Sequence, residues 1–172
     1  MNDLRSLVSQ FPRPGRLEEI LLRPARGAPM VQASECMAVA GFGLDGDRTA
    51  KGRGGGKRQV TLLQAEHLPV VAALLRRDVL HATDLRRNLV VSGLNLVASK
   101  SLFADQRIQV QVGQDVLIEI TGPCEPCSKM EDRLGPGAYN ALRGHGGVTA
   151  RIVQGGRIAT GDAVLCRVVV HP

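Results

Sequence analysis

The sequence predicts a mostly β fold, in which many short strands form a barrel or a sandwich rather than a helix bundle. Hydrophobic residues make up 44% of the 172 residues, yet the chain has only three Phe, one Tyr and no Trp. The core must therefore be aliphatic. Twenty Gly and nine Pro supply many turns between short elements. The length fits one domain, which at this size buries about 70% of its unfolded surface.

The N-terminal region predicts a helical cap over residues 1–14, followed by one β domain over residues 15–172. Apolar residues between Leu4 and Phe11 keep helical spacing until two prolines end the pattern. Two strands are then expected, over residues 16–24 and 31–40.

Residues 41–59 are rich in glycine and in Lys and Arg, which predicts a basic, flexible loop. Glycines let backbone N–H groups approach an anion closely. Five cations in this loop could neutralise such an anion: Arg48, Lys51, Arg53, Lys57 and Arg58. The loop does not match the Walker A pattern. A solvated loop that is charged only for solubility is the alternative.

The middle of the chain predicts a strand at 59–63, a helix at 64–77 and a second strand at 85–98. Three polar residues stand at the start of this second strand: Arg86, Arg87 and Asn88. Guanidinium groups make bidentate bonds to phosphate, so this cluster suits a phosphate or a pterin edge. An ordinary exposed strand end would have the same sequence.

Apolar and polar residues alternate through residues 107–122, which predicts a β-hairpin with its turn at Val112–Gln114. A short helix at 138–144 and two or three antiparallel strands in residues 148–170 are expected to follow the cysteine segment. Cys36 and Cys166 are expected to pack inside their strands.

The segment from Thr121 to Arg133 is the candidate active site, because two cysteines follow the end of the hairpin. Ser128 and Glu131 have capping-box spacing, which predicts a short helix that begins at Ser128. Cys127 would then lie at the N-terminus of the helix, where free N–H groups and the helix dipole favour a thiolate. A thiolate can act as a nucleophile or as a soft metal ligand. The positive charge of Lys129 also favours the thiolate, whereas the negative charges of the nearby glutamates disfavour it.

The formal net charge of +6 implies an anionic partner. Four aromatic residues are too few to stack single-stranded bases. Duplex binding through phosphates is the less favoured alternative, and no nucleic acid partner is expected. No apolar run approaches the ~20 residues of a membrane span, and the first residues lack the apolar core of a signal peptide. A cytoplasmic protein without a membrane partner is expected, with its four cysteines as reduced thiols.

Five motifs, in order, make the chain from Gly15 onward resemble the MOSC domain family, named for the C-terminal domain of molybdenum cofactor sulfurase. They are GLDGDR at 43–48, KRQVTLL at 57–63, RRNLVVSGLNL at 86–96, PCSKM at 126–130 and GGVTARIVQGGRIATGD at 146–162. The resemblance implies a closed or partly open β-barrel, similar to the barrel domain of pyruvate kinase, with a few short peripheral helices.

The resemblance also implies a role for Cys127, which would carry sulfur as a persulfide or bind the molybdenum of an anionic pterin cofactor. Positions matching the family's cofactor pocket are Arg48, Arg86, Arg87 and Asn88, with Lys57 and Lys129 as further candidates. Asp47 matches too and is expected to orient Arg48. Cys124 replaces an arginine found in several family members, and it could relay or resolve a persulfide.

Two activities are compatible with the resemblance, a sulfur carrier (a sulfurtransferase) and a molybdenum-dependent reductase of N-hydroxylated compounds (an oxidoreductase). The chain lacks the pyridoxal-phosphate desulfurase domain of full sulfurases, so no pyridoxal phosphate is expected. Sulfur or electrons would come from a separate protein, a desulfurase or an electron donor.

Two other readings use Cys124 and Cys127 as a C-x-x-C pair. The pair could supply half of a tetrahedral zinc site, although the remaining cysteines and His145 are isolated in sequence. It could also act as a dithiol oxidoreductase, which would require a thioredoxin-like βαβ context that the surrounding hairpins do not offer.

Overall fold

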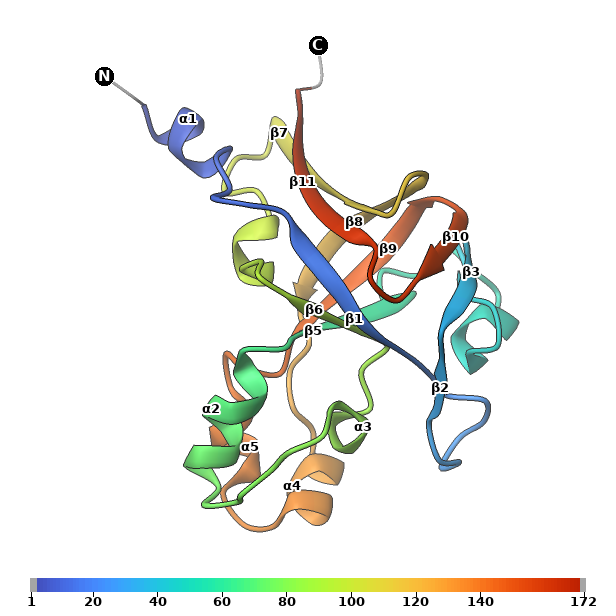
Figure 1. Cartoon of the computed structure of the whole chain (residues 1–172), viewed down its shortest axis with the longest axis vertical. Helices are drawn as coiled ribbons and strands as arrows, with labels where there is room; N and C mark the ends of the chain where they lie inside the picture. Colours follow the sequence, from blue (N-terminus) through green and yellow to red (C-terminus); the bar gives the residue numbers. More distant parts are fainter. Residues whose placement is uncertain (1–2, 171–172) are drawn as a thin grey trace.

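The computed structural model describes residues 3–170, and its main body is a closed seven-stranded β-barrel (Figure 1). The barrel strands are β1 (Gly15–Leu22), β5 (Val60–Gln64), β6 (Leu89–Ser92), β7 (Gln106–Val112), β8 (Val116–Pro123), β9 (Val148–Gln154) and β11 (Ala163–Val170). Their order is β11-β7-β8-β9-β5-β6-β1, and β1 pairs with β11 to close it. Neighbouring strands are antiparallel except β5 and β6. The predicted mostly β barrel is confirmed.

The barrel interior is aliphatic, as the composition predicts. Alternate residues of β7 are buried, from Gln106 to Val112, and Val110 pairs with Ile118 on β8 and with Cys166 on β11. The buried core cluster that fills the barrel consists only of Leu, Ile, Val and Ala. Cys36 and Cys166 pack against this cluster, as expected.

A small second sheet stands beside the barrel and contains β3 (Glu35–Val39), β4 (Gly43–Leu44) and β10 (Gly156–Ala159). The single strand predicted over 31–40 is wrong, because the chain breaks at Ser34. Before the break, β2 (Val31–Ala33) pairs with β1, and after it β3 pairs with β10. The Ser34 carbonyl accepts from the Thr160 N–H, which fixes the bend.

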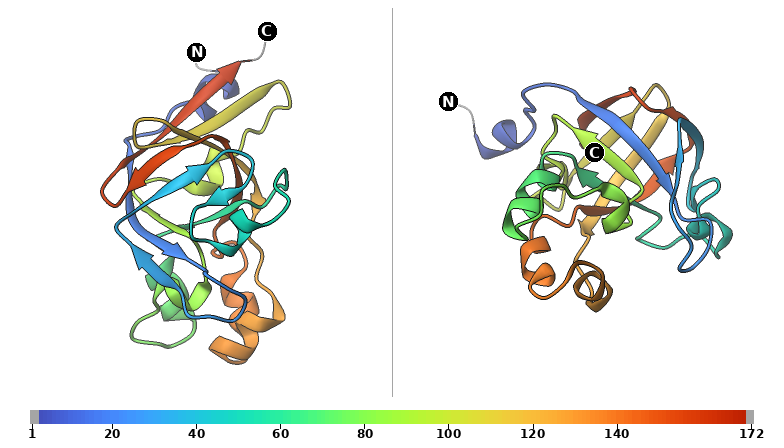
Figure 2. Two further views of the ribbon diagram at one scale, coloured as in Figure 1. Left: turned by 90° about the vertical axis from the view of Figure 1, so that its right-hand side faces the viewer. Right: turned by 60° about the horizontal axis from the view of Figure 1, so that its bottom comes forward.

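Short helices gather at one end of the barrel (Figures 1 and 2). They are α2 (His67–Leu74), α3 (Ala82–Leu85), α4 (Ser128–Leu134) and α5 (Ala138–Leu142). Their buried faces form a second apolar cluster with the barrel end, including Leu63 and Val90. The peripheral helices implied by the resemblance are confirmed, and this helical end holds the cysteine segment.

The strand predicted over 85–98 is shorter than expected. Helix α3 precedes it, β6 contains only four residues, and a 3-10 helix, η2 (Leu96–Ser99), follows it. The His81 N–H donates to the Asp84 carboxylate at 3.0 Å, which starts α3 where periodicity gave no sign of a helix.

The N-terminal helix α1 (Leu4–Val8) begins after Asp3, whose side chain accepts from the Ser6 N–H. None of its residues is buried, which agrees with a peripheral helix. The division into a cap and a barrel domain at residue 14 stays a prediction. No helix within residues 3–170 is long and apolar enough to cross a membrane.

Candidate functional site

A cavity of about 270 Å³ opens at the helical end of the barrel, and we call it the basic cavity. Seven arginines and one lysine line it, with no Asp or Glu: Arg23, Arg26, Arg48, Arg58, Arg86, Arg87, Arg133 and Lys129. Cys127, Gly27 and Met130 complete the lining. So many cations around a cavity whose lining contains no carboxylate make this a place where an anion is strongly favoured.

The fold brings the basic cavity together from five separate segments, one of which contributes Arg58 from the loop before β5. Arg23 follows β1, Arg48 begins the 3-10 helix η1 (Arg48–Lys51), and Arg86 and Arg87 link α3 to β6. Cys127 immediately precedes α4. Three of the arginines that the sequence assigned to a cofactor pocket therefore line one cavity with the predicted thiol.

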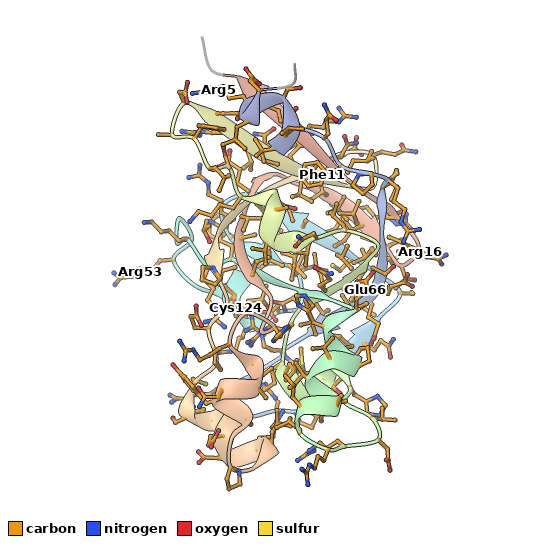
Figure 3. All side chains as sticks on the ribbon, turned by 90° about the vertical axis from the view of Figure 1, so that its left-hand side faces the viewer. Arg5, Phe11, Arg16, Arg53, Glu66 and Cys124 are labelled. Atoms are coloured by element: carbon orange, nitrogen blue, oxygen red, sulfur yellow. The ribbon has the colours of Figure 1, made fainter. Side chains whose placement is uncertain are left out.

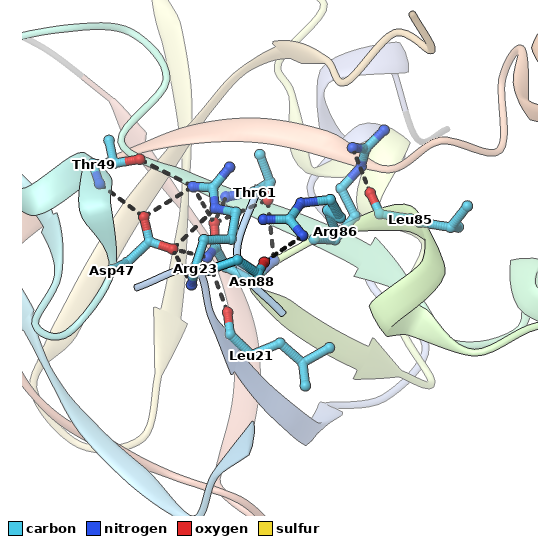
Figure 4. A network of polar contacts seen from close by, with 10 residues as sticks. Leu21, Arg23, Asp47, Thr49, Thr61, Leu85, Arg86 and Asn88 are labelled. Carbon is cyan, nitrogen blue, oxygen red and sulfur yellow. Dashed lines mark hydrogen bonds and ion pairs between the residues drawn. The ribbon is translucent and has the colours of Figure 1, made fainter. Parts of the chain in front are cut away.

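Beneath the cavity, Arg23 and Asp47 form a buried ion pair (Figure 4). Arg23 Nε donates to Asp47 Oδ2 at 2.9 Å and Nη2 donates to Oδ1 at 3.0 Å. Asn88 Nδ2 donates to Asp47 Oδ2 at 2.8 Å, while Asn88 Oδ1 accepts from Arg23 Nη2 at 3.2 Å. The expectation that Asp47 orients Arg48 is wrong. Asp47 is instead the counter-charge of Arg23, whose buried guanidinium requires one.

Hydrogen bonds decide the protonation state of Asp47. Burial of its carboxyl group favours the neutral form, but hydrogen bonds from the Arg23 side chain and from the backbone of Thr49 and Arg23 outweigh burial and lower the pKa of Asp47 to about 2. The carboxylate is therefore charged at any ordinary pH. Asn88 is 1% exposed and does not line the cavity, so it supports Arg23 from below.

Arg87 is the structural link between the cysteine segment and α3. It is 4% exposed, and its guanidinium donates to three carbonyl oxygens, those of Gly146 (2.7 Å), Leu85 (2.9 Å) and Cys124 (3.3 Å). Burial lowers the pKa of Arg87. Its bonds to backbone atoms fix the position of the segment that leads to Cys127.

Arg86 adopts a left-handed backbone conformation, with φ of 54°, at the end of α3. This conformation is uncommon for residues other than glycine, and an arginine that adopts it costs the fold conformational free energy. Its Nη1 donates to the Ala28 carbonyl at 2.8 Å. Burial lowers the pKa of Arg86, and the positive charges of Arg133, Arg23 and Arg48 lower it further. An anion in the cavity would relieve this repulsion.

Helix α4 begins at Ser128, as predicted, but the predicted capping box is wrong. Cys127 occupies the cap position without a side-chain hydrogen bond, and its carbonyl accepts from the Met130 N–H at 2.8 Å. The Glu131 carboxylate instead accepts from the N–H groups of Gly137 and Tyr139, both at 2.6 Å. Glu131 thus satisfies the free N–H groups at the start of α5.

Cys127 is the exposed cysteine of the four, all of which are free thiols. Cys124 is 2% exposed and lies at the junction of the barrel and the helical end (Figure 3). Cys36 and Cys166 are half-buried, and burial raises the pKa of Cys36 to about 11, which keeps it protonated. Burial also raises the pKa of Cys166.

Some residues that the sequence assigned to the site lie outside the basic cavity. Cys124 lines a different, apolar cavity. Lys57 lines a third hollow beside β7 and β8. Arg53 projects from its loop into solvent (Figure 3). Sequence reasoning also missed two of the lining arginines, Arg23 and Arg26. A charged residue directly after an apolar strand is a signal that could have indicated Arg23.

Brief alkylation of the native protein should modify Cys127 and leave Cys124 unmodified. Cys127 is exposed, whereas Cys124 is 2% exposed, so the reagent should reach the Cys124 thiol far more slowly. Mass spectrometry of peptides after treatment with iodoacetamide at neutral pH measures both sites, and unfolded protein, in which all four thiols react, provides the control. Equal labelling of Cys124 and Cys127 in the native protein would contradict this prediction.

The two alternative readings of the C-x-x-C pair gain no support. Within residues 3–170, no three side chains among His, Cys, Asp and Glu gather closely enough to hold a metal ion. A parallel β–α–β connection does exist, from β5 through α2 and α3 to β6, but both cysteines follow the antiparallel strand β8 instead.

The fold and the site together define a β-barrel domain with a basic cavity that holds an exposed thiol. The MOSC domain family model matches residues 49–165, and the chain belongs to the MOSC domain family. A search of curated proteins gave no match.

Solved structures share this fold. The YuaD protein of Bacillus subtilis is 17% identical, with a TM-score of 0.70 over 93% of this chain and 98% of the YuaD chain. YiiM of Geobacillus stearothermophilus is 17% identical, with a TM-score of 0.63 over 92% of this chain and 76% of that chain. YiiM of Escherichia coli is 18% identical, with a TM-score of 0.62 over 91% and 71%.

Proposed function

We propose that this protein binds the anionic molybdenum–pterin cofactor in the basic cavity, with the Cys127 sulfur as its ligand or as the carrier of a persulfide. The observation that carries the proposal is the lining of the basic cavity, where eight cations and no carboxylate surround an exposed thiol. Membership of the MOSC domain family supports the same cofactor.

The cations would hold the anionic groups of the cofactor in two ways. Arg48, Arg58, Arg133 and Lys129 are exposed at the cavity and can turn toward a ligand. Arg23 and Arg87 are held in place by buried hydrogen bonds, so they lose little conformational entropy on binding. Charge-assisted bonds from guanidinium groups to phosphate are short and strong.

Cys127 would supply the sulfur chemistry. A thiolate is a soft ligand that suits molybdenum, and it is also the form that accepts a sulfur atom. When bound, the cofactor would supply two-electron redox chemistry. Both the sulfur-carrier and the reductase activity require a separate donor protein, either a pyridoxal-phosphate-dependent desulfurase or an electron donor. A reducing, cytoplasmic compartment fits the four free thiols.

The arrangement of the charges favours a small anion over a nucleic acid. The eight cations gather around one cavity of about 270 Å³. Duplex DNA presents phosphates along both strands, and a protein binds it through many contacts spread over a face.

Protein made in a host that synthesises the cofactor should carry molybdenum and pterin. In the Cys127→Ser variant the arginines remain, so pterin should be retained while molybdenum or persulfide sulfur is lost. Metal analysis, pterin fluorescence after oxidation, and the mass gain of one sulfur atom on Cys127 are the measurements.

A Cys36→Ser variant removes a thiol from β3, outside the basic cavity, and is the matched control. Molybdenum on the wild type identifies the reductase route, and a persulfide without molybdenum identifies the carrier route. The proposal fails if wild-type protein from such a host carries neither pterin nor persulfide, or if Cys127→Ser and Cys36→Ser behave alike.

A further inference from the structure

A second cavity of about 270 Å³ lies next to the basic cavity and shares none of its lining residues. Its walls are apolar side chains and bare backbone: Val97, Ile120, Pro123 and Val148, with Cys124 and the glycines at 122, 144, 146 and 147. Lys100 and Glu125 are the charged residues in its lining. We call it the apolar cavity.

Gly122 keeps the apolar cavity open. A Cβ atom at this position would meet no atom within 4 Å, and the backbone is not left-handed, so neither crowding nor conformation requires glycine. At Gly146 and Gly147, by contrast, a Cβ would collide with backbone oxygens at 2.6 Å and 2.1 Å. Gly122 lies within the pairing of β8 with β9, opposite Thr149, where β-branched and aromatic residues are usual. A side chain there would fill the cavity.

The shape and the lining indicate the class of ligand. The volume of about 270 Å³ is just below the range of roughly 300–1,000 Å³ for drug-sized ligands, which suits a molecule of one or two rings. Bare glycine backbone and a proline ring provide flat walls, and thiol sulfur makes favourable contacts with aromatic rings. We propose that the apolar cavity is a binding site for a small, neutral, flat apolar molecule.

Arg87 forms part of the wall between the two cavities. It lines the basic cavity, and it donates to the carbonyls of Cys124 and Gly146, which line the apolar cavity. The apolar site nevertheless depends on residues of its own. The proposed apolar site does not require a pterin in the basic cavity, and the experiment that tests it uses no cofactor.

Indole is a suitable probe because the chain contains no tryptophan and only one tyrosine, so the probe emission has no tryptophan background. Its emission should shift on saturable binding, with a Kd on the order of 100 μM for so small a ligand. The Gly122→Leu variant should bind indole at least about tenfold more weakly, because the new side chain occupies the cavity. The matched control is Gly56→Leu. Gly56 is also unstrained and open, but it lies in the basic loop and lines neither cavity.

Two further variants make the result decisive. A neighbouring groove beside α1 shares Val97 and Lys100 with the apolar cavity, and Leu7 lines only that groove. Leu7→Arg should leave indole binding unchanged. Val97→Arg, at a position 60% exposed, should weaken it and replaces Gly122→Leu if that variant does not fold. No saturable binding below about 1 mM, unchanged binding in Gly122→Leu, or loss in Leu7→Arg would overturn the proposal.

Discussion

Replacing Asp47 with alanine should lower the free energy of unfolding by about 3–5 kcal/mol, because it leaves the buried Arg23 guanidinium without its counter-charge. The side chain of Asp47 is 1% exposed, and it accepts hydrogen bonds from Arg23, Asn88 and the Thr49 N–H. Urea denaturation at neutral pH measures the change.

A matched control removes a carboxylate from an exposed pair with arginine. Glu35 and Arg157 are bonded at the surface between β3 and β10, so Glu35→Ala should have little effect on stability. A loss in Asp47→Ala no larger than in Glu35→Ala would show that the buried pair contributes little.

The same pair determines part of the acid sensitivity. The pKa of Asp47 in the folded protein is about 2, below the roughly 3.9 of an unfolded aspartate. Its contribution to stability is therefore present above about pH 4 and is lost as the pH falls toward 2. The wild type should lose stability over this window more steeply than the Asp47→Ala variant does.

Replacing Arg86 with glycine should weaken anion binding by roughly 10–100-fold while changing the free energy of unfolding by less than about 1 kcal/mol. The lost guanidinium is worth one or more charge-assisted bonds. Glycine relieves the left-handed strain at φ 54°, and this offsets its greater loss of conformational freedom on folding and the lost bond to Ala28. Calorimetry with pyrophosphate, a compact polyanion, measures the affinity.

Arg76 provides the control for Arg86. It follows α2 with φ of 52° and lines neither cavity, so Arg76→Gly makes the same change away from the site. Its anion affinity should match the wild type. If Arg76→Gly weakens binding as much as Arg86→Gly does, the effect arises from the fold or from net charge.

Local patterns predict the parts of this fold that local interactions determine. The hairpin of β7 and β8 follows from alternation around Gly113, and α1 ends before its prolines. The break at Ser34 could not be predicted, because its cause is a hydrogen bond from Thr160, 126 residues away. Helix α3 has only four residues, so the spacing of its apolar residues cannot indicate a helix.

The candidate site follows the same division. Motifs identified Cys127 and the arginines at 48, 86 and 87, and all four line the basic cavity. The partner of Asp47 is fixed by the packing of the end of β1 against the segment between β4 and η1, so sequence adjacency to Arg48 was misleading. The spacing of Ser128 and Glu131 predicts a capping box that does not form, because the Glu131 carboxylate accepts from N–H groups at the start of α5 instead.

Closure of the barrel joins strands from opposite ends of the described chain, with Gly15 opposite Val164 and Arg16 opposite Ala163. During synthesis, β1 therefore leaves the ribosome long before its partner β11 exists. At ~5–20 residues per second, this delay is on the order of ten seconds. β2 can pair with Ile20–Leu22 on this edge of β1, but the part at Gly15 and Arg16 stays unpaired for that time, when it can bind a chaperone or another strand. Closure of the barrel can therefore begin only after β11 has been synthesised.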